Sequence, residues 1–372
     1  MQPLKALGLM SGTSMDGIDL AMIETDGETV QARGPSRFVA YDAAFRRRLE
    51  ASLETAKAIR RRDDRPADLA AIERDVTLRH AEAVMALLAD ASETWRHPEV
   101  VGFHGQTVLH RPLEGLTVQL GDGSLLAGEI GRRVVYDMRA NDMIFGGQGA
   151  PLVPAYHAAL ARSLPTRLAG QWPIVFVNIG GISNITFVPE TGDPVGFDTG
   201  PGNALIDQWV AREGGVPFDA GGAIASEGGV VQAVVGRYLE KPFFGRSGPK
   251  SLDRNDFTLA EAAGLGLADG ARTLAAISAQ AILRSVEHLP QPPKLWIICG
   301  GGRRNPHIVA DLRAGAGDSE VLVAEDVALD GDQTEAEAWA FLAVRALRGL
   351  PLTWPTTTGC REAVSGGVVA LP

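Results

Sequence analysis

A glycine- and hydroxyl-rich turn near the start of the chain has the composition of a phosphate-binding loop. It lies between two apolar segments in the stretch LMSGTSMDGIDLA, residues 9–21. Glycines let the backbone approach a ligand closely, and the N–H and hydroxyl groups of the turn can direct donors toward one point. Asp16 adds a carboxylate at the tip, which suits a hydrated Mg²⁺ that bridges phosphate oxygens. The alternative is a plain β-hairpin, because Asp16-Gly17 is by itself a strong hairpin signal.

A second turn of this kind occurs in GFDTGPGNALID, residues 196–207. A strand is expected to end at Asp198. A helix is expected to start near Asn203, with its positive end toward the turn that contains Gly200 and Gly202. Asp198 could hold metal-bound water or orient a phosphate-linked cation. The alternative is an Asx-type turn closed by Asp198, with Asn203 as the cap of the helix.

A third turn follows in ICGGGRRNPHI, residues 297–308, where an apolar strand leads through three glycines into a helix. Gly300, Gly301 and Gly302 leave a bare backbone surface that suits an adenine or ribose, and Asn305 could supply a polar contact. A tight strand-to-helix turn would use the same residues. Three such turns in one chain together favour nucleotide binding.

Acid–base candidates lie in YDMRANDMIFGGQGAPLVPAYH, residues 136–157. Asp137, Arg139 and Asp142 come just before the loop Gly146–Gly149, so a carboxylate is delivered on a segment flanked by glycine. Arg139 could keep Asp142 ionised and aimed. Phosphoryl transfer to an oxygen nucleophile needs such a positioned base, which typically contributes ~10²–10⁴-fold in rate. The alternative is a loop-capping aspartate.

Two further groups of polar residues are candidates for substrate contacts. His104, Gln106 and His110 fall in GFHGQTVLHRP, at the end of a strand with a buried pattern, and could contact a substrate or be satisfied histidines in a turn. Glu335 lies near the start of the last expected helix, where a carboxylate is normally a partner of the helix dipole. No His/Glu spacing around the two histidines indicates a metal ligated by protein side chains.

Composition excludes several classes of protein. The chain has 372 residues, 45% hydrophobic and 22% charged, which is typical of a globular protein of roughly two domains. Its net charge of −10 argues against a general nucleic-acid binder, because Arg46–Arg48 and Arg60–Arg62 are expected to be solvated faces. Cys299 and Cys360 allow no disulfide framework or cysteine zinc site, which fits a reducing cytoplasm. Neither a signal peptide nor a membrane-spanning segment is expected.

The elements that position these residues form two halves, each opening with a strand, a glycine-rich turn and a second strand. The first hairpin is expected at Leu4–Met10 and Ile18–Thr25, and the second at Pro173–Ile179 and Ile185–Val188. Helices follow the strands in both halves, so we expect an α/β architecture with helices packed over mixed sheets. A cleft between such halves would be the natural ligand site.

The chain resembles the 1,6-anhydro-N-acetylmuramic acid kinase family, within the superfamily of acetate and sugar kinases, heat-shock proteins and actin-like ATPases. The resemblance runs from residue 9 to about 343 and rests on the blocks LMSGTSMDGIDLA, GFHGQTVLHRP, QLGDGSLLA, DMRANDMIFGGQGAPLVPAYH, NIGGISNIT, GFDTGPGNALID, CGGGRRNPHI and EAEAWAFLA. It implies an α/β fold of two ribonuclease H-like lobes with an inter-lobe cleft. Residues 1–138 and about 347–372 would form the first lobe, and residues 139–346 the second.

Such a kinase would use ATP, Mg²⁺ and water to open the 1,6-anhydro ring of 1,6-anhydro-N-acetylmuramic acid while phosphorylating O6, giving N-acetylmuramic acid 6-phosphate in cell-wall (peptidoglycan) recycling. The resemblance assigns the catalytic base to Asp142 and a substrate contact to Glu335, beside the candidate contacts His104, Gln106 and Arg139. Mg²⁺ would be held through water by Asp16 and Asp198. The expected nucleotide-binding residues are Ser11, Gly12, Thr13, Ser14, Met15, Asp16, Gly17, Ile18, Asp198, Gly200, Gly202, Asn203, Gly300, Gly301, Gly302 and Asn305.

Two other functions compete with this one. A kinase of the same fold acting on another anhydro-sugar, such as levoglucosan, would use identical phosphate machinery. The pocket for the N-acetyl and lactyl groups would discriminate, because an amino-sugar acid needs a cation or N–H donors for its carboxylate. A non-catalytic nucleotide-binding sensor is the alternative from another class, and the retention of Asp142 and the GGQGAP loop argues against it. The family resemblance is compatible with a homodimer. Met138 and Ala140-Asn141 depart from the residues usual in the family.

Overall fold

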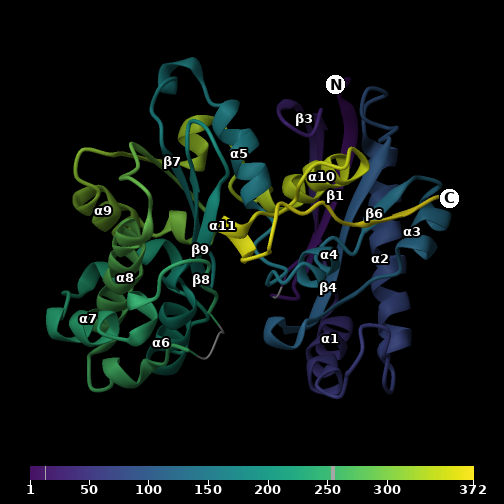
Figure 1. The fold of residues 1–372 in the computed structure, drawn as a ribbon. Coiled ribbons are helices and arrows are strands. Elements are labelled where there is room, and N and C mark those ends of the chain that lie inside the picture. Colours follow the sequence, from purple (N-terminus) through teal and green to yellow (C-terminus); the bar gives the residue numbers. More distant parts are fainter. Residues whose placement is uncertain (13, 253–255) are drawn as a thin grey trace. The chain divides into compact units, whose positions relative to one another are not determined.

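The computed structural model describes residues 1–12, 14–252 and 256–372. They form two compact units, one of Met1–Ser163 with Gln333–Pro372 and the other of Leu164–Asp332 (Figure 1). Residues 139–163 and 333–346, which the resemblance assigns to the second lobe, fall in the first unit. The physical reason is that the last long helix packs against the strands of that unit.

The first unit is built on a seven-stranded sheet with the order β12-β6-β4-β1-β2-β3, to which β5 adds beside β4. The first three strands form an antiparallel meander, followed by two strands that run parallel to β1. Antiparallel additions at β4 and β6 complete the sheet. The strands are β1 (Leu4–Ser11), β2 (Gly17–Thr25), β3 (Val30–Ala40), β4 (Val100–Arg111), β5 (Leu116–Leu120), β6 (Val134–Tyr136) and β12 (Val368–Ala370).

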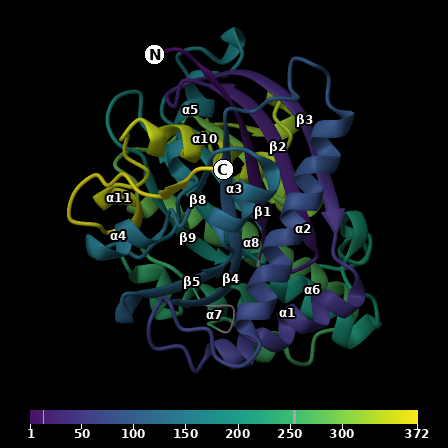
Figure 2. The ribbon, with the colours of Figure 1, turned by 90° about the vertical axis from the view of Figure 1, so that its right-hand side faces the viewer.

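Helices cover both faces of this sheet, and Figure 2 shows α1, α2 and α3 in front of its strands. Leu7 and Leu9 of β1 point into the core that these helices share. Side chains alternate along a strand, so Gly8 faces the opposite side, where α10 packs. A Cβ added at Gly8 would lie 1.8 Å from the carbonyl oxygen of Ala336, so glycine is needed for this close approach. The helices are α1 (Ala43–Ala56), α2 (Leu69–Asp90), α3 (Gly123–Ile130), α4 (Ala140–Ile144), α5 (Pro154–Arg162), α10 (Thr334–Leu347) and α11 (Pro355–Thr358).

The second unit contains a five-stranded sheet with the order β11-β10-β7-β8-β9. Its core is rich in aromatic residues, among them Phe187, Trp209 and Trp296. The strands are β7 (Ile174–Ile179), β8 (Ile182–Val188), β9 (Val195–Pro201), β10 (Leu295–Cys299) and β11 (Glu320–Val323). The helices are α6 (Ala204–Gly214), α7 (Gln232–Leu239), α8 (Leu267–Arg284) and α9 (Pro306–Gly315).

The two sheets repeat one topology. In each, three consecutive antiparallel strands are followed by two strands parallel to the first, giving β3-β2-β1-β4-β6 in one unit and β9-β8-β7-β10-β11 in the other. This is the ribonuclease H-like arrangement that the resemblance implies. The structure therefore confirms the α/β class, and it shows in the strand order the duplication that the sequence shows only in the succession of its elements.

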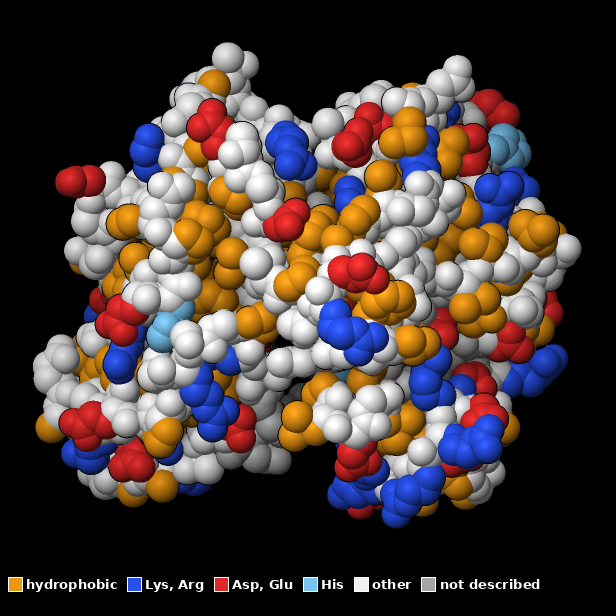
Figure 3. All heavy atoms as spheres, in the orientation of Figure 1, with side chains coloured by type: hydrophobic (Ala, Val, Ile, Leu, Met, Phe, Trp, Pro, Cys, Tyr) orange, Lys and Arg blue, Asp and Glu red, His pale blue; other side chains and the backbone are white. Residues whose placement is uncertain are grey.

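The surface agrees with the expectation that the arginine clusters are solvated faces. Arg46 pairs with Glu50 at 3.2 Å and Arg48 with Asp75 at 2.6 Å, and all four side chains are exposed. Figure 3 shows Lys and Arg side chains interspersed with Asp and Glu on the visible face. Among the described residues, no helix combines the length and the hydrophobicity required to cross a bilayer.

Candidate active site

The hairpin predicted at residues 9–21 is present, formed by β1 and β2. The hydroxyl of Ser11 points inward: it is fully buried and donates to Oε1 of Gln106 at 2.7 Å, with the hydroxyl of Tyr41 at 3.0 Å. At the exposed tip, Ser14 donates to Oδ1 of Asp16 at 2.6 Å. The hydroxyls of Ser11 and Ser14 therefore do not converge on one point. Ser11 supports the turn through hydrogen bonds inside the protein, and Asp16 is exposed at the tip as predicted.

Most of the remaining residues of the predicted phosphate loop are part of the turn or of the core. Met15 is buried with a left-handed backbone (φ 52°), and its N–H donates to the carbonyl of Gly12 at 3.2 Å, which makes a tight turn. Gly17 begins β2, and Ile18 is buried in the core. Thr13, also predicted to bind nucleotide, lies outside the described residues. In the described part of the loop, the side chains at the surface are those of Ser14 and Asp16.

Gln106, predicted to contact substrate, holds the base of the same loop. Its side chain is fully buried, accepts from Ser11 and donates from Nε2 to the carbonyl of Gly12 at 3.0 Å. The pairing of β1 with β4 shifts register between Leu9 and Ser11, which brings Gln106 opposite Ser11. Gln106 therefore supports the turn between β1 and β2 from within the protein.

His104 is held as a neutral ring between β1 and α10. Its Nε2 accepts from Arg139 at 3.1 Å, since a guanidinium only donates, and so Nδ1 carries the proton that reaches the carbonyl of Ser11 at 3.2 Å. Burial, followed by the neighbouring Arg139, holds the pKa of His104 well below its usual value. The ring lies 4.5 Å from the ring of Trp339. His104 is therefore a fixed acceptor for Arg139 at neutral pH.

Arg139 links this histidine to the glycine loop. Its Nη1 donates to the carbonyl of Gly149 at 2.9 Å, and its guanidinium lies 5.3 Å from the centre of the Trp339 ring. Burial lowers the pKa of Arg139 to about 10, while Glu335 and Asp142 act to raise it. Arg139 therefore stays charged at neutral pH. Glu335 and Asp142 are both near enough to stabilise that charge.

Asp142 lies in α4 with its side chain almost fully buried and held by three donors. Oδ2 accepts the N–H of Gly149 at 2.6 Å, and Oδ1 accepts the hydroxyls of Thr353 and Thr358 at 2.6 Å each. The loop presses close to it, since a Cβ at Gly147 would lie 2.2 Å from Oδ2. Sequence reasoning missed both threonines, because they lie far along the chain in a segment with no recognised motif. The carboxylate is aimed by packing, as the prediction of a positioned base requires.

Glu335 occupies the first turn of α10, as predicted. The helix is anchored two residues further on, where buried Glu337 accepts from the hydroxyl of Tyr156 and pairs with Arg33 at 3.1 Å. The first unit therefore brings together the predicted catalytic and substrate residues Asp142, Arg139, His104 and Glu335.

The second and third glycine turns lie together in the second unit. β7, β9 and β10 end at the same edge of the sheet, and the turns after them pack on one another. The N–H of Asn203 donates to the carbonyl of Gly180 at 2.8 Å, and its Nδ2 to the carbonyl of Ile179 at 3.2 Å. At Gly300, with φ 73°, a Cβ would lie 2.4 Å from Oδ1 of Asn178. The structure thus joins the turns that sequence reasoning predicted for phosphate and adenosine.

Two side chains of these turns have structural partners. Asn203 occupies the N-cap position of α6, but its side chain does not cap the helix and bonds the carbonyl of Ile179 instead. Asn305 caps α9, where Oδ1 accepts the N–H of His307 at 3.0 Å, so this oxygen is already engaged in the turn. The alternative of a side-chain cap by Asn203 is therefore wrong, because its amide is bonded to the end of β7. Gly200, Gly202, Gly301 and Gly302 remain as bare backbone along this edge.

Asp198 is the strongest candidate in the second unit for holding metal-bound water. Its Oδ2 accepts the N–H of Leu252 at 2.8 Å. Burial raises the pKa of Asp198 to about 6, and that hydrogen bond opposes the rise. Within the described ranges, no group of three or more His, Cys, Asp or Glu side chains could ligate a metal. Single carboxylates such as Asp16 and Asp198 suit Mg²⁺, which usually keeps several of its waters.

Comparison with known proteins gives a consistent result. The family model described as anhydro-N-acetylmuramic acid kinase matches residues 4–372. A protein of that name from Agrobacterium fabrum is 54% identical over 366 residues, 98% of this chain and 98% of that protein. One from Brucella abortus is 55% identical over 370 residues, 99% of each chain. Among solved structures, a ROK hexokinase from Thermus thermophilus covers 92% of this chain and 99% of its own, at 12% identity and a TM-score of 0.43. Similarity as low as that supports no conclusion about the site.

Proposed function

This chain belongs to the anhydro-N-acetylmuramic acid kinase family, and from this premise we propose that it phosphorylates 1,6-anhydro-N-acetylmuramic acid. The enzyme is a phosphotransferase with an alcohol group as acceptor. It consumes ATP and water, opens the 1,6-anhydro ring and yields N-acetylmuramic acid 6-phosphate and ADP. Such a reaction belongs to peptidoglycan recycling. The match over residues 4–372 supports the proposal.

The observation that carries the mechanism is the carboxylate of Asp142, packed against the glycine loop. In the proposed step, Asp142 takes a proton from a water molecule whose oxygen forms a bond to C1 of the sugar. The bond from C1 to O6 breaks, and O6 takes the γ-phosphoryl group of ATP, releasing ADP. A carboxylate offers about four acceptor positions, and three donors already contact this one. About one position is left to receive the proton of the water.

Arg139 and Glu335 would bind the sugar in this scheme. Arg139 is charged and fixed by His104 and Gly149, so it can hold an oxygen of the substrate without reorganising. Glu335 can accept a hydrogen bond from a sugar hydroxyl. These residues bind and orient the sugar, whereas Asp142 acts on the water.

The nucleotide is proposed to contact the backbone of residues 11–18 and the glycine turns that contain Gly200, Gly202 and Gly300–Gly302. Asp16 and Asp198 are the residues that we propose for Mg²⁺, each through water, and the ion would supply positive charge to the phosphoryl group in transfer. Asp198 is ionised above a pKa of about 6 and can then bind metal-bound water. We further propose a cytoplasmic location, because both cysteines are free and buried, as expected in a reducing compartment. The substrate of the proposed reaction is a small molecule. A homodimer stays a prediction from the family.

The proposal is tested by mass spectrometry of the product after incubation with Mg-ATP and the anhydro-sugar in H₂¹⁸O. A phosphorylated sugar carrying ¹⁸O at C1, formed by the wild type and lost in Asp142→Asn, is the expected result. Circular dichroism of the variant separates a chemical defect from unfolding. Intact ATP with this sugar but turnover of levoglucosan would reassign the substrate. Nucleotide binding without turnover of any anhydro-sugar would favour the sensor.

A further inference from the structure

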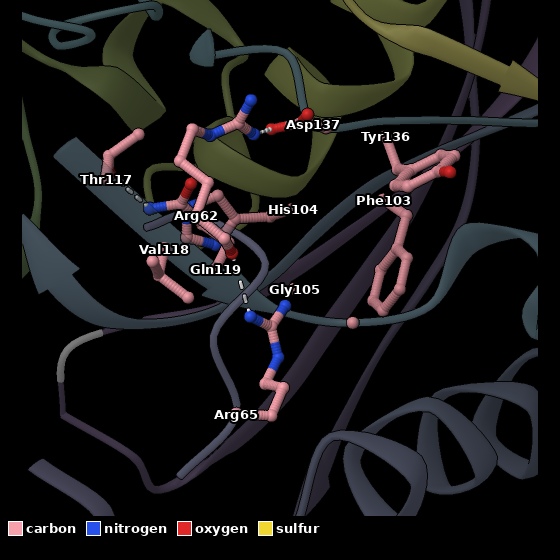
Figure 4. Close-up of a pocket in the computed structure, with 11 residues that line it drawn as sticks. Arg62, Arg65, Phe103, His104, Gly105, Thr117, Val118, Gln119, Tyr136 and Asp137 are labelled. Carbon is pink, nitrogen blue, oxygen red and sulfur yellow. Dashed lines mark hydrogen bonds and ion pairs between the residues drawn. The ribbon is translucent and has the colours of Figure 1, made fainter. Parts of the chain in front are cut away.

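A small cavity in the first unit lies beside the candidate active site and was not predicted from the sequence. Its volume is about 100 Å³, and it is lined by the loop after α1, the strands β4 and β5, and the end of β6 with the residue that follows it. Figure 4 shows Arg62 reaching toward Asp137, with Gln119 and His104 lining the same cavity. It is thus a polar pocket with a cation at its rim.

Hydrogen bonds connect the wall of this cavity to the catalytic base. His104 lines the cavity and accepts from Arg139 at 3.1 Å, Arg139 donates to the carbonyl of Gly149 at 2.9 Å, and the N–H of Gly149 donates to Asp142 at 2.6 Å. Asp137, on another wall, is joined to Asp142 through the start of α4. The cavity therefore belongs to the same rigid arrangement as the base.

The two arginines of the cavity differ in how far they are already paired. Arg65 holds Glu73 through Nε at 2.9 Å and Nη2 at 2.7 Å, and Nη1 donates to backbone carbonyls of the loop. Arg62 donates only from Nη2, to Asp137, among the residues that the structure describes. A guanidinium carries several further N–H donors, so most of those of Arg62 remain available. Arg62 is the cation that an incoming anion would meet.

The rest of the lining is mixed in polarity. Gln119 donates from Nε2 to Thr117 at 2.8 Å and to Thr107 at 3.2 Å, which orients its amide. Phe103 and Val118 supply apolar walls. A cavity of about 150 Å³ accommodates a benzene ring, so one of about 100 Å³ takes a substituent of roughly five heavy atoms and excludes a bicyclic sugar. A short, branched, anionic group fits this size and charge.

We propose that this cavity binds the lactyl group of the substrate, with Arg62 as the ion-pair partner of its carboxylate. The inference rests on the proposed function, because it assumes a muramic acid substrate. The lactyl methyl lies against the apolar wall in this arrangement, and the carboxylate accepts from the free N–H groups of Arg62. Charge-assisted hydrogen bonds from arginine to a carboxylate are among the strongest in proteins. Arg62 is therefore a specificity-determining residue that favours acidic anhydro-sugars over neutral ones.

The N-acetyl group is the competing occupant, since it has a similar size. It carries no charge, so Arg62 would contribute little to its recognition. The substrate in which the lactyl carboxylate is replaced by an amide keeps the shape and loses the charge. Comparing these two substrates therefore isolates the interaction that the inference needs.

The experiment measures kcat and KM for 1,6-anhydro-N-acetylmuramic acid and for its lactamide, in the wild type, Arg62→Gln and Arg61→Gln. Arg61 is the matched control, because it lies in the same loop, its side chain is 77% exposed and it pairs with Asp63, which does not line the cavity. We expect the wild type to have a KM for the lactamide roughly 10-fold to 100-fold above that for the acid. Arg62→Gln should abolish most of this difference, and Arg61→Gln should keep it.

Each outcome has a distinct meaning. Failure of the wild type to phosphorylate the acid would overturn the proposed function itself. Turnover of the acid without discrimination against the lactamide would leave that function intact and overturn the inference. Discrimination that survives in Arg62→Gln would also overturn it. An equal loss for both substrates in Arg62→Gln would also overturn the inference, because it would mean that Arg62 supports the loop and does not recognise the carboxylate.

Discussion

Thr353 donates its hydroxyl to Oδ1 of Asp142 at 2.6 Å, although the two residues lie 211 positions apart in the chain. Thr358 donates to the same oxygen at 2.6 Å. The chain after α10 also reaches the glycine loop, since the N–H of Gln148 donates to the carbonyl of Thr358 at 2.9 Å. The C-terminal segment therefore closes over the carboxylate proposed as the base and decides which way it points.

Thr353→Val and Thr358→Val should each lower kcat roughly 10-fold or more while changing KM little, because each leaves the buried carboxylate with two donors in place of three and so less firmly aimed. Thr353→Ser keeps the hydroxyl and should retain most of the activity. Steady-state kinetics of the four proteins, wild type included, checks this. Valine variants with the kcat of the wild type would show that the threonines do not position Asp142.

Gly147→Ala should inactivate the enzyme, because the added Cβ would lie 2.2 Å from Oδ2 of Asp142 and must displace the carboxylate. Gly128→Ala in α3 is the matched control, since nothing lies within 4 Å of its added Cβ. The control should keep full activity and gain about 0.5–1 kcal/mol in the free energy of unfolding. Activity assays and urea titrations measure both effects. An active Gly147→Ala protein would contradict the tight packing of base and loop.

The ionisation of Asp198 should lower the free energy of unfolding as pH rises. Its folded pKa of about 6 is above the ordinary value of 3.8, so the folded state binds more protons between these values. The contribution of Asp198 is most favourable below pH 3.8 and is lost as pH rises through about 6. Asp198→Asn removes this loss and should raise the free energy of unfolding by up to about 3 kcal/mol at pH 8, with little change at pH 4.

The same substitution should reduce activity, because the proposed Mg²⁺ water needs a carboxylate. Thermal unfolding at several pH values and the dependence of rate on Mg²⁺ concentration measure the two effects separately. If the variant is more stable at pH 8 and its rate depends on Mg²⁺ concentration as that of the wild type does, Asp198 does not take part in binding Mg²⁺.

Arg139→Lys should lower kcat/KM by about 10-fold or more. A single ammonium group does not reproduce the two donors that reach His104 and Gly149 at once. Arg133→Lys, at an exposed position of the same region, is the control and should leave kcat/KM unchanged. Equal values for both variants would mean that the link from His104 to the glycine loop does not matter for turnover.

The local chemistry of the sequence was sufficient to predict the elements and the turns. Alternating apolar residues and glycine turns are properties of neighbouring positions, so the two hairpins, the α/β class and the placement of Asp142 before the glycine loop followed from short stretches. The family blocks extended this to the reaction, because they preserve residue types at fixed spacing. The strands of the two hairpins begin and end within about three residues of the predicted positions, as expected for signals that act locally.

The tertiary structure alone decided which polar atoms are free. Ser11 and Gln106 were predicted to face ligands, yet they bond to each other across 95 positions of the chain. Asn203 was weighed as a cap and instead bonds Ile179. Thr353 and Arg62 carried no recognised motif, and they reach Asp142 and the cavity only because distant segments pack against α4 and β4. A hydrogen bond between distant residues depends on how sheets and helices pack, and that packing leaves no periodic signal in the sequence.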